Sequence, residues 1–208
     1  MIELTQGIKE IERNINKAIA QEVNVLLFQK KSRIEKECTK LVSGWIISQP
    51  EIKSLTSSTP KSLSGQFGLY PGSDELAVDN IISAVENSIS TKLTRVNDKL
   101  IGGLEVYFQP DNFANLLGLS SGHVYYADGD LHWLDWLLTE GDNIIVVNYS
   151  YNPTTGLGRS GLGNMQKTGS FRVPPEYSGT KENNFITRAL IGSQQETDIF
   201  NVFKKELA

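Results

Sequence analysis

Cysteine and histidine are scarce in this sequence of 208 residues, which holds one cysteine and two histidines. The single cysteine, Cys38, excludes a disulfide within the chain and any metal site built from several cysteines. It falls among apolar positions of a predicted helix, so we expect a buried, unreactive thiol and a cytosolic folding environment. His123 and His132 lie on different predicted elements, without the spacing of a metal site. We expect His132 to make a surface hydrogen bond to Asp135, one helical turn further on.

Long apolar runs and basic blocks are also absent. No stretch approaches the roughly 18 consecutive apolar residues of a membrane-spanning helix. The first 21 residues mix acids and bases, so we predict no signal peptide. Because 20 basic and 24 acidic residues are interspersed, binding to nucleic acid or to a membrane surface is not expected to be the main role. These features predict a soluble protein with no membrane partner.

Motifs for catalysis are weak. Gly156–Gly161 matches G-x-G-x-x-G, but a dinucleotide-binding loop opens directly into an apolar helix, and here the polar segment 164–170 follows. We therefore interpret 152–169 as a loop that is flexible or ordered at an interface. No G-K-[ST] or G-x-S-x-G pattern is present, although spacing alone does not exclude a Ser-His-Asp triad. We predict no catalytic residues, no cofactor and no metal.

Residues 1–49 are predicted to form one long amphipathic helix. Apolar residues recur every three or four positions from Ile8 through Ile15 to Leu26, and again from Ile34 to Trp45. The spacing departs from a strict heptad repeat, which favours packing on a globular body or on a neighbouring subunit. The polar run at 29–33 marks a point for a bend or a break. An unbroken helix would be roughly 65 Å long, so we expect part of it to need a partner.

The rest of the chain predicts an α+β fold, a small mixed β-sheet flanked by short helices. Residues 50–72, rich in Ser, Thr, Pro and Gly, are interpreted as a connector. Residues 73–192 are assigned to the α+β domain and 193–208 to a C-terminal helical tail. The run 144–147 is apolar on both faces, which predicts a strand in the middle of the sheet. Asp130 and Asn183 or Asn184 are the expected helix caps.

Trp133 and Trp136 lie on one side of the helix that is predicted to follow Asp130. Packing in the core is the first expectation for this pair. A contact between subunits is the second, because aromatic residues anchor the centres of interfaces.

Three features between Trp133 and Leu190 together carry a family resemblance. An apolar helix ends in Leu-Thr-Glu-Gly at 138–141, a strand and a loop rich in glycine follow, and Asn-Phe-Ile-Thr-Arg-Ala-Leu at 184–190 closes the segment. This order resembles the head–tail joining proteins of tailed bacteriophages, and within them the neck and tail-completion proteins. In those families a helix with an acidic-glycine turn precedes a strand, and an aromatic–aliphatic–x–Arg–Ala–Leu helix closes the domain. The connector at 50–72 and a strand near 100–109 depart from the pattern.

The resemblance implies a small virion subunit that assembles in the host cytoplasm into a ring, usually six-fold, at the neck or the upper end of the tail. Other neck and tail proteins would be its partners, and DNA would pass through the channel without sequence-specific binding. A ring needs two different patches on each subunit, which we assign to the 1–49 helix and the 152–169 loop. The candidate interface residues are Ile8, Ile15, Leu26, Trp133, Trp136, Gly158, Arg159, Gly161, Arg172 and Arg188.

Two alternatives remain open from the sequence. In the first, the chain is an enzyme or a nucleotide-binding protein, with Arg159, Lys167 and an acid such as Glu140 or Asp142 converging in one pocket. In the second, it is a scaffold or assembly module whose long helix binds a partner helix, as a monomer or dimer with an exposed apolar stripe.

Overall fold

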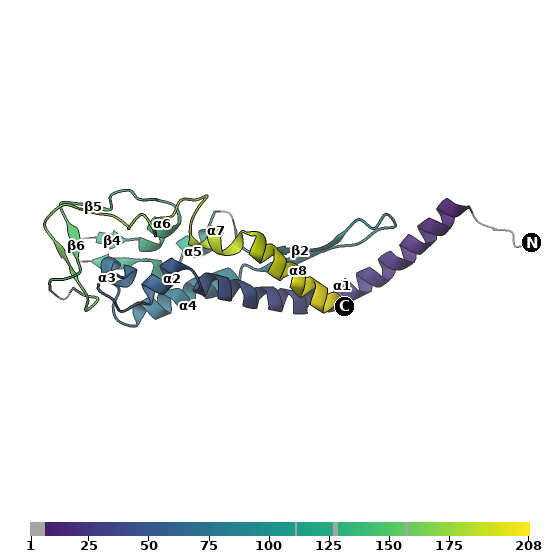
Figure 1. The fold of residues 1–208 in the computed structure, drawn as a ribbon, viewed down its shortest axis with the longest axis horizontal. Helices are drawn as coiled ribbons and strands as arrows, with labels where there is room; N and C mark the ends of the chain where they lie inside the picture. Colours follow the sequence, from purple (N-terminus) through teal and green to yellow (C-terminus); the bar gives the residue numbers. More distant parts are fainter. Residues whose placement is uncertain (1–6, 111, 127–128, 157) are drawn as a thin grey trace, which may run out of the picture.

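The computed structural model describes residues 7–110, 112–126, 129–156 and 158–208. The elements in chain order are α1 (Ile8–Ile47), α2 (Pro50–Leu55), α3 (Leu63–Phe67), α4 (Ser73–Glu86), β1 (Ser90–Thr94), β2 (Gly103–Tyr107), α5 (Ala114–Leu117), η1 (Ser120–Gly122), β3 (Val124–Tyr126), β4 (Gly129–Leu131), α6 (Trp133–Leu138), β5 (Val146–Val147), β6 (Ser150–Asn152), β7 (Asn164–Gln166), β8 (Ser170–Phe171), α7 (Phe185–Leu190) and α8 (Ser193–Leu207). The molecule is elongated, with the start of α1 at one end and the β6 region at the other (Figure 1).

The predicted α+β class and the long N-terminal helix are confirmed. One main core joins segments that the sequence separates: Val42 of α1, Ile52 of α2, Ile81 of α4, Trp133 of α6 and Phe185 of α7 are all buried in it. Burial of large apolar side chains from so many parts of the chain supplies the main driving force for folding. None of the described helices is both long and apolar enough to cross a membrane.

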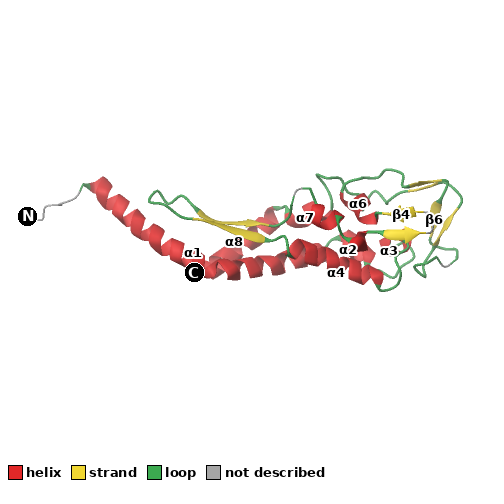
Figure 2. Ribbon diagram, turned by 180° about the vertical axis from the view of Figure 1, so that it is seen from behind, coloured by secondary structure: helices red, strands yellow, loops and turns green. Residues whose placement is uncertain are grey.

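α1 is one unbroken helix of 40 residues, about 60 Å long at 1.5 Å per residue. The polar run at 29–33 does not interrupt it, although Figures 1 and 2 show its first half curving away from the body. The predicted inward positions Ile34 and Cys38 are buried. Near the C-terminal end Val42 and Ile46 are fully buried, whereas the predicted Trp45 is only partly buried against the core. This shift of one position brings another face of the helix against the core.

The interpretation of 50–72 as a connector was wrong, because α2 and α3 lie there and belong to the core. Ile52, Leu55, Leu63 and Phe67 are buried. The serines that gave the segment its polar composition satisfy buried backbone groups. Ser54 Oγ, for example, accepts a hydrogen bond from the Leu63 backbone N–H at 3.0 Å.

The prediction of one mixed sheet was also wrong. The described strands form four separate antiparallel pairs, β1–β2, β3–β4, β5–β8 and β6–β7. The run 144–147 is not a central strand, since β5 contains two residues and both Val146 and Val147 are exposed. Asp130 lies in β4 and His132 is the N-cap of α6. The predicted cap Asn184 is confirmed, and Gly141 has a positive φ of 67°.

Candidate functional site

The first half of α1, residues 8–28, extends beyond the main core, and we call it the arm (Figure 1). The β1–β2 hairpin supports one side of it. Asn24 makes two hydrogen bonds to the backbone of Val96. Its Nδ2 donates to the Val96 carbonyl oxygen (2.9 Å), and its Oδ1 accepts from the Val96 N–H (2.8 Å). Arg13 Nε lies 3.0 Å from Asp98 Oδ2 in the same loop. These contacts fix the hairpin to one face of the arm.

Another side of the arm carries an exposed apolar stripe. Ile8, Ile15 and Ile19 are 77%, 54% and 44% exposed, whereas Ala20 and Leu27 are buried with Val96 in a small second cluster. At about 100° per residue, the three isoleucines lie roughly 80–140° around the helix from Ala20 and Leu27. Leu26 lies on the stripe and is half-buried. Thus two of the three predicted arm residues, Ile8 and Ile15, are fully available at the surface.

The glycine-containing loop packs on the protein's own body. A Cβ on Gly158 would lie 2.5 Å from the Gly163 carbonyl oxygen, and one on Gly163 would lie 2.2 Å from the Asn152 oxygen. Gly161 has a positive φ (73°), whereas Gly158 does not. Gly158 is required for close approach, and Gly161 for its backbone conformation. The described residues of the loop therefore pack closely against one another and against the rest of the chain.

Arg159 holds this loop against α3 and β3. Its guanidinium carbon lies 4.3 Å from the ring centroid of Tyr70 and 5.0 Å from that of Tyr126. Its Nη1 donates to the Tyr125 carbonyl oxygen at 2.9 Å. Two cation–π contacts and this hydrogen bond together restrict the position of the side chain. The two tyrosines give no signal in the sequence that would pair them with Arg159.

Trp133 is fully buried and stacks on Phe67 with ring centroids 5.6 Å apart. Its Nε1 donates to the Ser121 carbonyl oxygen at 3.1 Å. Its assignment as an interface residue was therefore wrong, and the first expectation, core packing, is confirmed. Trp136 is half-buried at the edge of the same core.

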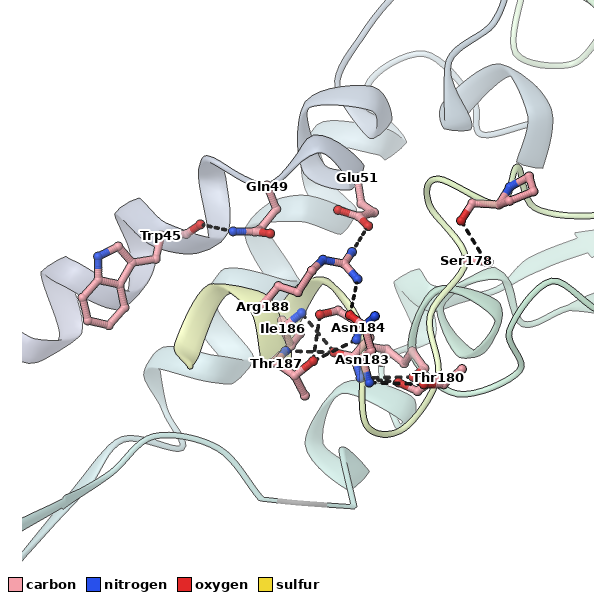
Figure 3. Close-up of polar contacts among 12 residues, drawn as sticks. Trp45, Gln49, Glu51, Ser178, Thr180, Asn183, Asn184, Ile186, Thr187 and Arg188 are labelled. Atoms are coloured by element: carbon pink, nitrogen blue, oxygen red, sulfur yellow. Dashed lines mark hydrogen bonds and ion pairs between the residues drawn. The ribbon is translucent and has the colours of Figure 1, made fainter. Parts of the chain in front are cut away.

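Arg188 of α7 forms an ion pair with Glu51 of α2, which is completely buried (Figure 3). Arg188 Nη1 also donates to Asn183 Oδ1 at 2.8 Å. Burial raises the pKa of the Glu51 carboxyl, against the opposing effects of a backbone hydrogen bond and the Arg188 charge. The second carboxyl oxygen, Oε2, has no hydrogen-bond partner among the described residues. In this structure Arg188 is thus engaged in an internal contact, which the sequence does not reveal.

Asn184 fixes the start of α7 immediately beside that pair. Its side-chain oxygen accepts from the backbone N–H groups of Ile186 and Thr187, both at 3.0 Å. The Thr187 hydroxyl accepts in return from the Asn184 backbone N–H at 2.8 Å, which completes a capping box (Figure 3). By fixing the start of α7, this cap sets the position on the helix from which the Arg188 side chain reaches Glu51.

Arg172 and the residues of the enzyme alternative have separate partners. Arg172 Nη1 lies 3.2 Å from Asp142 Oδ2, with both side chains about half exposed. Glu140 forms an isolated β-bridge with Thr180, whereas Arg159 contacts the tyrosines. The described contacts therefore do not bring Arg159 together with Glu140 or Asp142 in the way that the enzyme alternative requires.

The two histidines meet in space. Their rings stack with centroids 3.9 Å apart, and His123 Nδ1 lies 2.8 Å from Asp130 Oδ2. Burial, and then the neighbouring His123, lower the pKa of His132. The partner we expected for His132, Asp135, is hydrogen-bonded to Thr139 instead. In the β3–β4 hairpin Val124 pairs with Leu131 and Tyr125 with Asp130, which brings the two histidines together at the open end of the pair. The Asp-Gly pair at 128–129 of the sequence is a hairpin signal that could have indicated this pairing.

Cys38 is buried, as expected, and burial raises the pKa of its thiol to about 11. Within the described ranges, no group of three or more His, Cys, Asp or Glu side chains is arranged to hold a metal ion.

Comparison with known proteins gives no relative: no family model, curated protein or solved structure matches the chain.

Proposed function

We propose that this protein is a non-enzymatic virion subunit of a tailed phage, acting in the neck or in tail completion. The observation that carries the proposal is the exposed stripe Ile8, Ile15 and Ile19 on an arm that extends past the core. Large aliphatic residues gathered on one side of a surface helix are typical of a protein–protein contact. The phage assignment itself rests on the resemblance at 133–190.

In this proposal the arm of one subunit packs against a different surface of the next subunit. Such head-to-tail contacts close into a ring when the rotation between subunits allows it. The ring, six-fold by the resemblance, joins the head-side connector to the tail and binds other neck and tail proteins. DNA passes through its channel without sequence-specific binding, and no membrane is involved.

A second candidate is a scaffold or assembly module whose arm enters a partner's helical bundle. The observation in its favour is that Val25 and Phe28, exposed by 53% and 74%, lie away from the isoleucine stripe. A helix with apolar residues on more than one side is suited to a site that surrounds it. This candidate predicts a monomer or dimer that acquires one partner.

The test is the mass of the protein in solution, measured alone and with virion neck components. We expect a ring-sized species, near six copies of the 23.1 kDa chain, in at least one condition. Ile15→Lys and Ile19→Lys should abolish it, because a lysine in the stripe places a charge in the apolar contact. Gln21→Lys adds the same charge elsewhere on the exposed surface of the arm and should leave the assembly intact.

A single-copy mass in both conditions would exclude the ring. Loss of assembly in Gln21→Lys equal to that in Ile15→Lys would show that charge, and not the stripe, governs association. A dimer or a one-to-one complex that Ile15→Lys disrupts would favour the scaffold.

A further inference from the structure

A cavity of about 480 Å³ lies away from the arm, between the start of α4 and the segment formed by η1 and β3. This volume is within the range of small-molecule sites in proteins. α4 lines it with Ser73, Leu76 and Asn80, and η1 contributes Ser120 and Ser121. Arg159 reaches it from the glycine-containing loop. The cavity thus collects hydroxyl, amide and guanidinium groups from three parts of the chain.

The charge of this lining is one-sided. Arg159 is permanently positive, and none of the lining residues, all of them described, is Asp or Glu. The two acids in the first turn of α4, Asp74 and Glu75, are not among them. Asp130 contacts His123 from outside the lining. A lining of this kind is complementary to an anion.

Arg159 is already positioned to bind one. Tyr70 and Tyr126 both contact its guanidinium, and the Tyr125 carbonyl accepts from Nη1. Its buried Nε has no hydrogen-bond partner among the described residues. Because the side chain is held before any ligand arrives, little rotamer entropy remains to be lost on binding.

The rim of the cavity adds aromatic surface. Tyr70 and Tyr125 are 56% and 64% exposed, and Tyr125 lies parallel to His123 at a centroid distance of 5.9 Å. Exposed aromatic rings beside a fixed cation are suited to a nucleotide, since the base can stack while the phosphate meets the positive charge. We propose that this cavity binds a nucleoside monophosphate, with its phosphate on Arg159 and the serine hydroxyls and its base on the tyrosines.

The test is isothermal titration of the full chain with adenosine 5′-monophosphate, with adenosine, and with inorganic phosphate. We expect saturable binding of the monophosphate with a Kd below about 1 mM. Adenosine and phosphate should each bind at least about tenfold more weakly, because each makes only one half of the contacts. Equal affinity for adenosine and its monophosphate would overturn the proposal, as would no saturation by the monophosphate.

Two variants localise the site. Asn80→Asp places a negative charge in the lining without touching Arg159, and should weaken binding about tenfold or more. Asn201→Asp makes the same change at an exposed position of α8 and should bind as the unaltered protein does. Arg159→Met should also weaken binding at least about tenfold, with circular dichroism confirming the fold. Unchanged binding in Asn80→Asp would place the ligand elsewhere and refute the assignment. The oligomer mass is an independent readout, so either proposal can fail alone.

Discussion

Removal of the Arg188 side chain should destabilise the protein strongly and in a pH-dependent way. Glu51 is fully buried, and Arg188 is the cation that pairs with it in the structure. Removal of one partner of a buried ion pair typically lowers the free energy of unfolding by about 3–5 kcal/mol, because the remaining charge is left without compensation. The Arg188 side chain is 36% exposed, so water partly replaces it and we expect the lower end, about 3 kcal/mol, for Arg188→Met at pH 7.

The pH dependence follows from the raised pKa of Glu51. A carboxyl whose pKa is higher in the folded than in the unfolded protein stabilises the fold at a pH below its unfolded pKa, about 4.5 for Glu51. This stabilisation is lost as the pH rises through the folded pKa. Loss of the Arg188 charge raises the folded pKa further. The deficit of Arg188→Met should therefore shrink as the pH falls from 7 toward 5, where protonation neutralises the buried group.

Urea unfolding followed by circular dichroism between pH 5 and 8 measures both effects. Glu51→Gln keeps the shape of the side chain without its charge, and the double variant Glu51→Gln/Arg188→Met should recover at least about 1 kcal/mol relative to Arg188→Met. The matched control is Arg172→Met, which breaks the half-exposed pair with Asp142 and should cost less than about 1 kcal/mol. A deficit below about 1 kcal/mol in Arg188→Met, or one that does not change with pH, would refute this reasoning.

Three further predictions concern two backbone positions and the thiol. Gly44→Ala should stabilise the protein by about 0.5–1 kcal/mol, because this glycine lies inside α1 with open space around it. Gly179→Ala should instead destabilise by about 2 kcal/mol or more in the same urea titration, since its Cβ would lie 1.9 Å from the Leu137 carbonyl oxygen. Cys38 should react slowly with a thiol reagent at pH 8 and rapidly in urea, because the folded-state pKa of about 11 leaves little thiolate; fast reaction of the folded protein would contradict its burial.

The fold class was predictable because it depends on local patterns. The spacing of Ile34 and Cys38 on α1 and the cap at Asn184 each act within a few residues, and both appear as expected. The core role of 50–72 was not predictable in this way. Its apolar residues are few and widely spaced, and the partners that bury Leu63 and Phe67 come from distant segments. Composition shows that the segment is rich in serine, but it does not show which buried backbone groups those serines hydrogen-bond.

The candidate site, too, was predictable from the sequence only in part. The arm was predictable from length alone, since a helix of this size exceeds what a small core can cover, and Ile8 and Ile15 are exposed. The pairings of Arg159 with Tyr70 and of Arg188 with Glu51 were not, because 89 and 137 residues separate the partners. Charge and aromatic character mark these side chains as capable of contact, but only the tertiary fold selects the partner.

The β1–β2 hairpin explains how a partly unburied arm keeps its helical shape. In a protein, most of the stability of a helix comes from tertiary packing of one of its faces. Asn24 ties the arm to the Val96 backbone, and Ala20 and Leu27 pack on Val96, so the hairpin supplies tertiary contacts on one side only. The isoleucine stripe on another side is then held in register before a partner arrives. Since a preorganised helix loses less conformational entropy on binding than one that must fold, the hairpin and the arm form one unit in the proposed assembly.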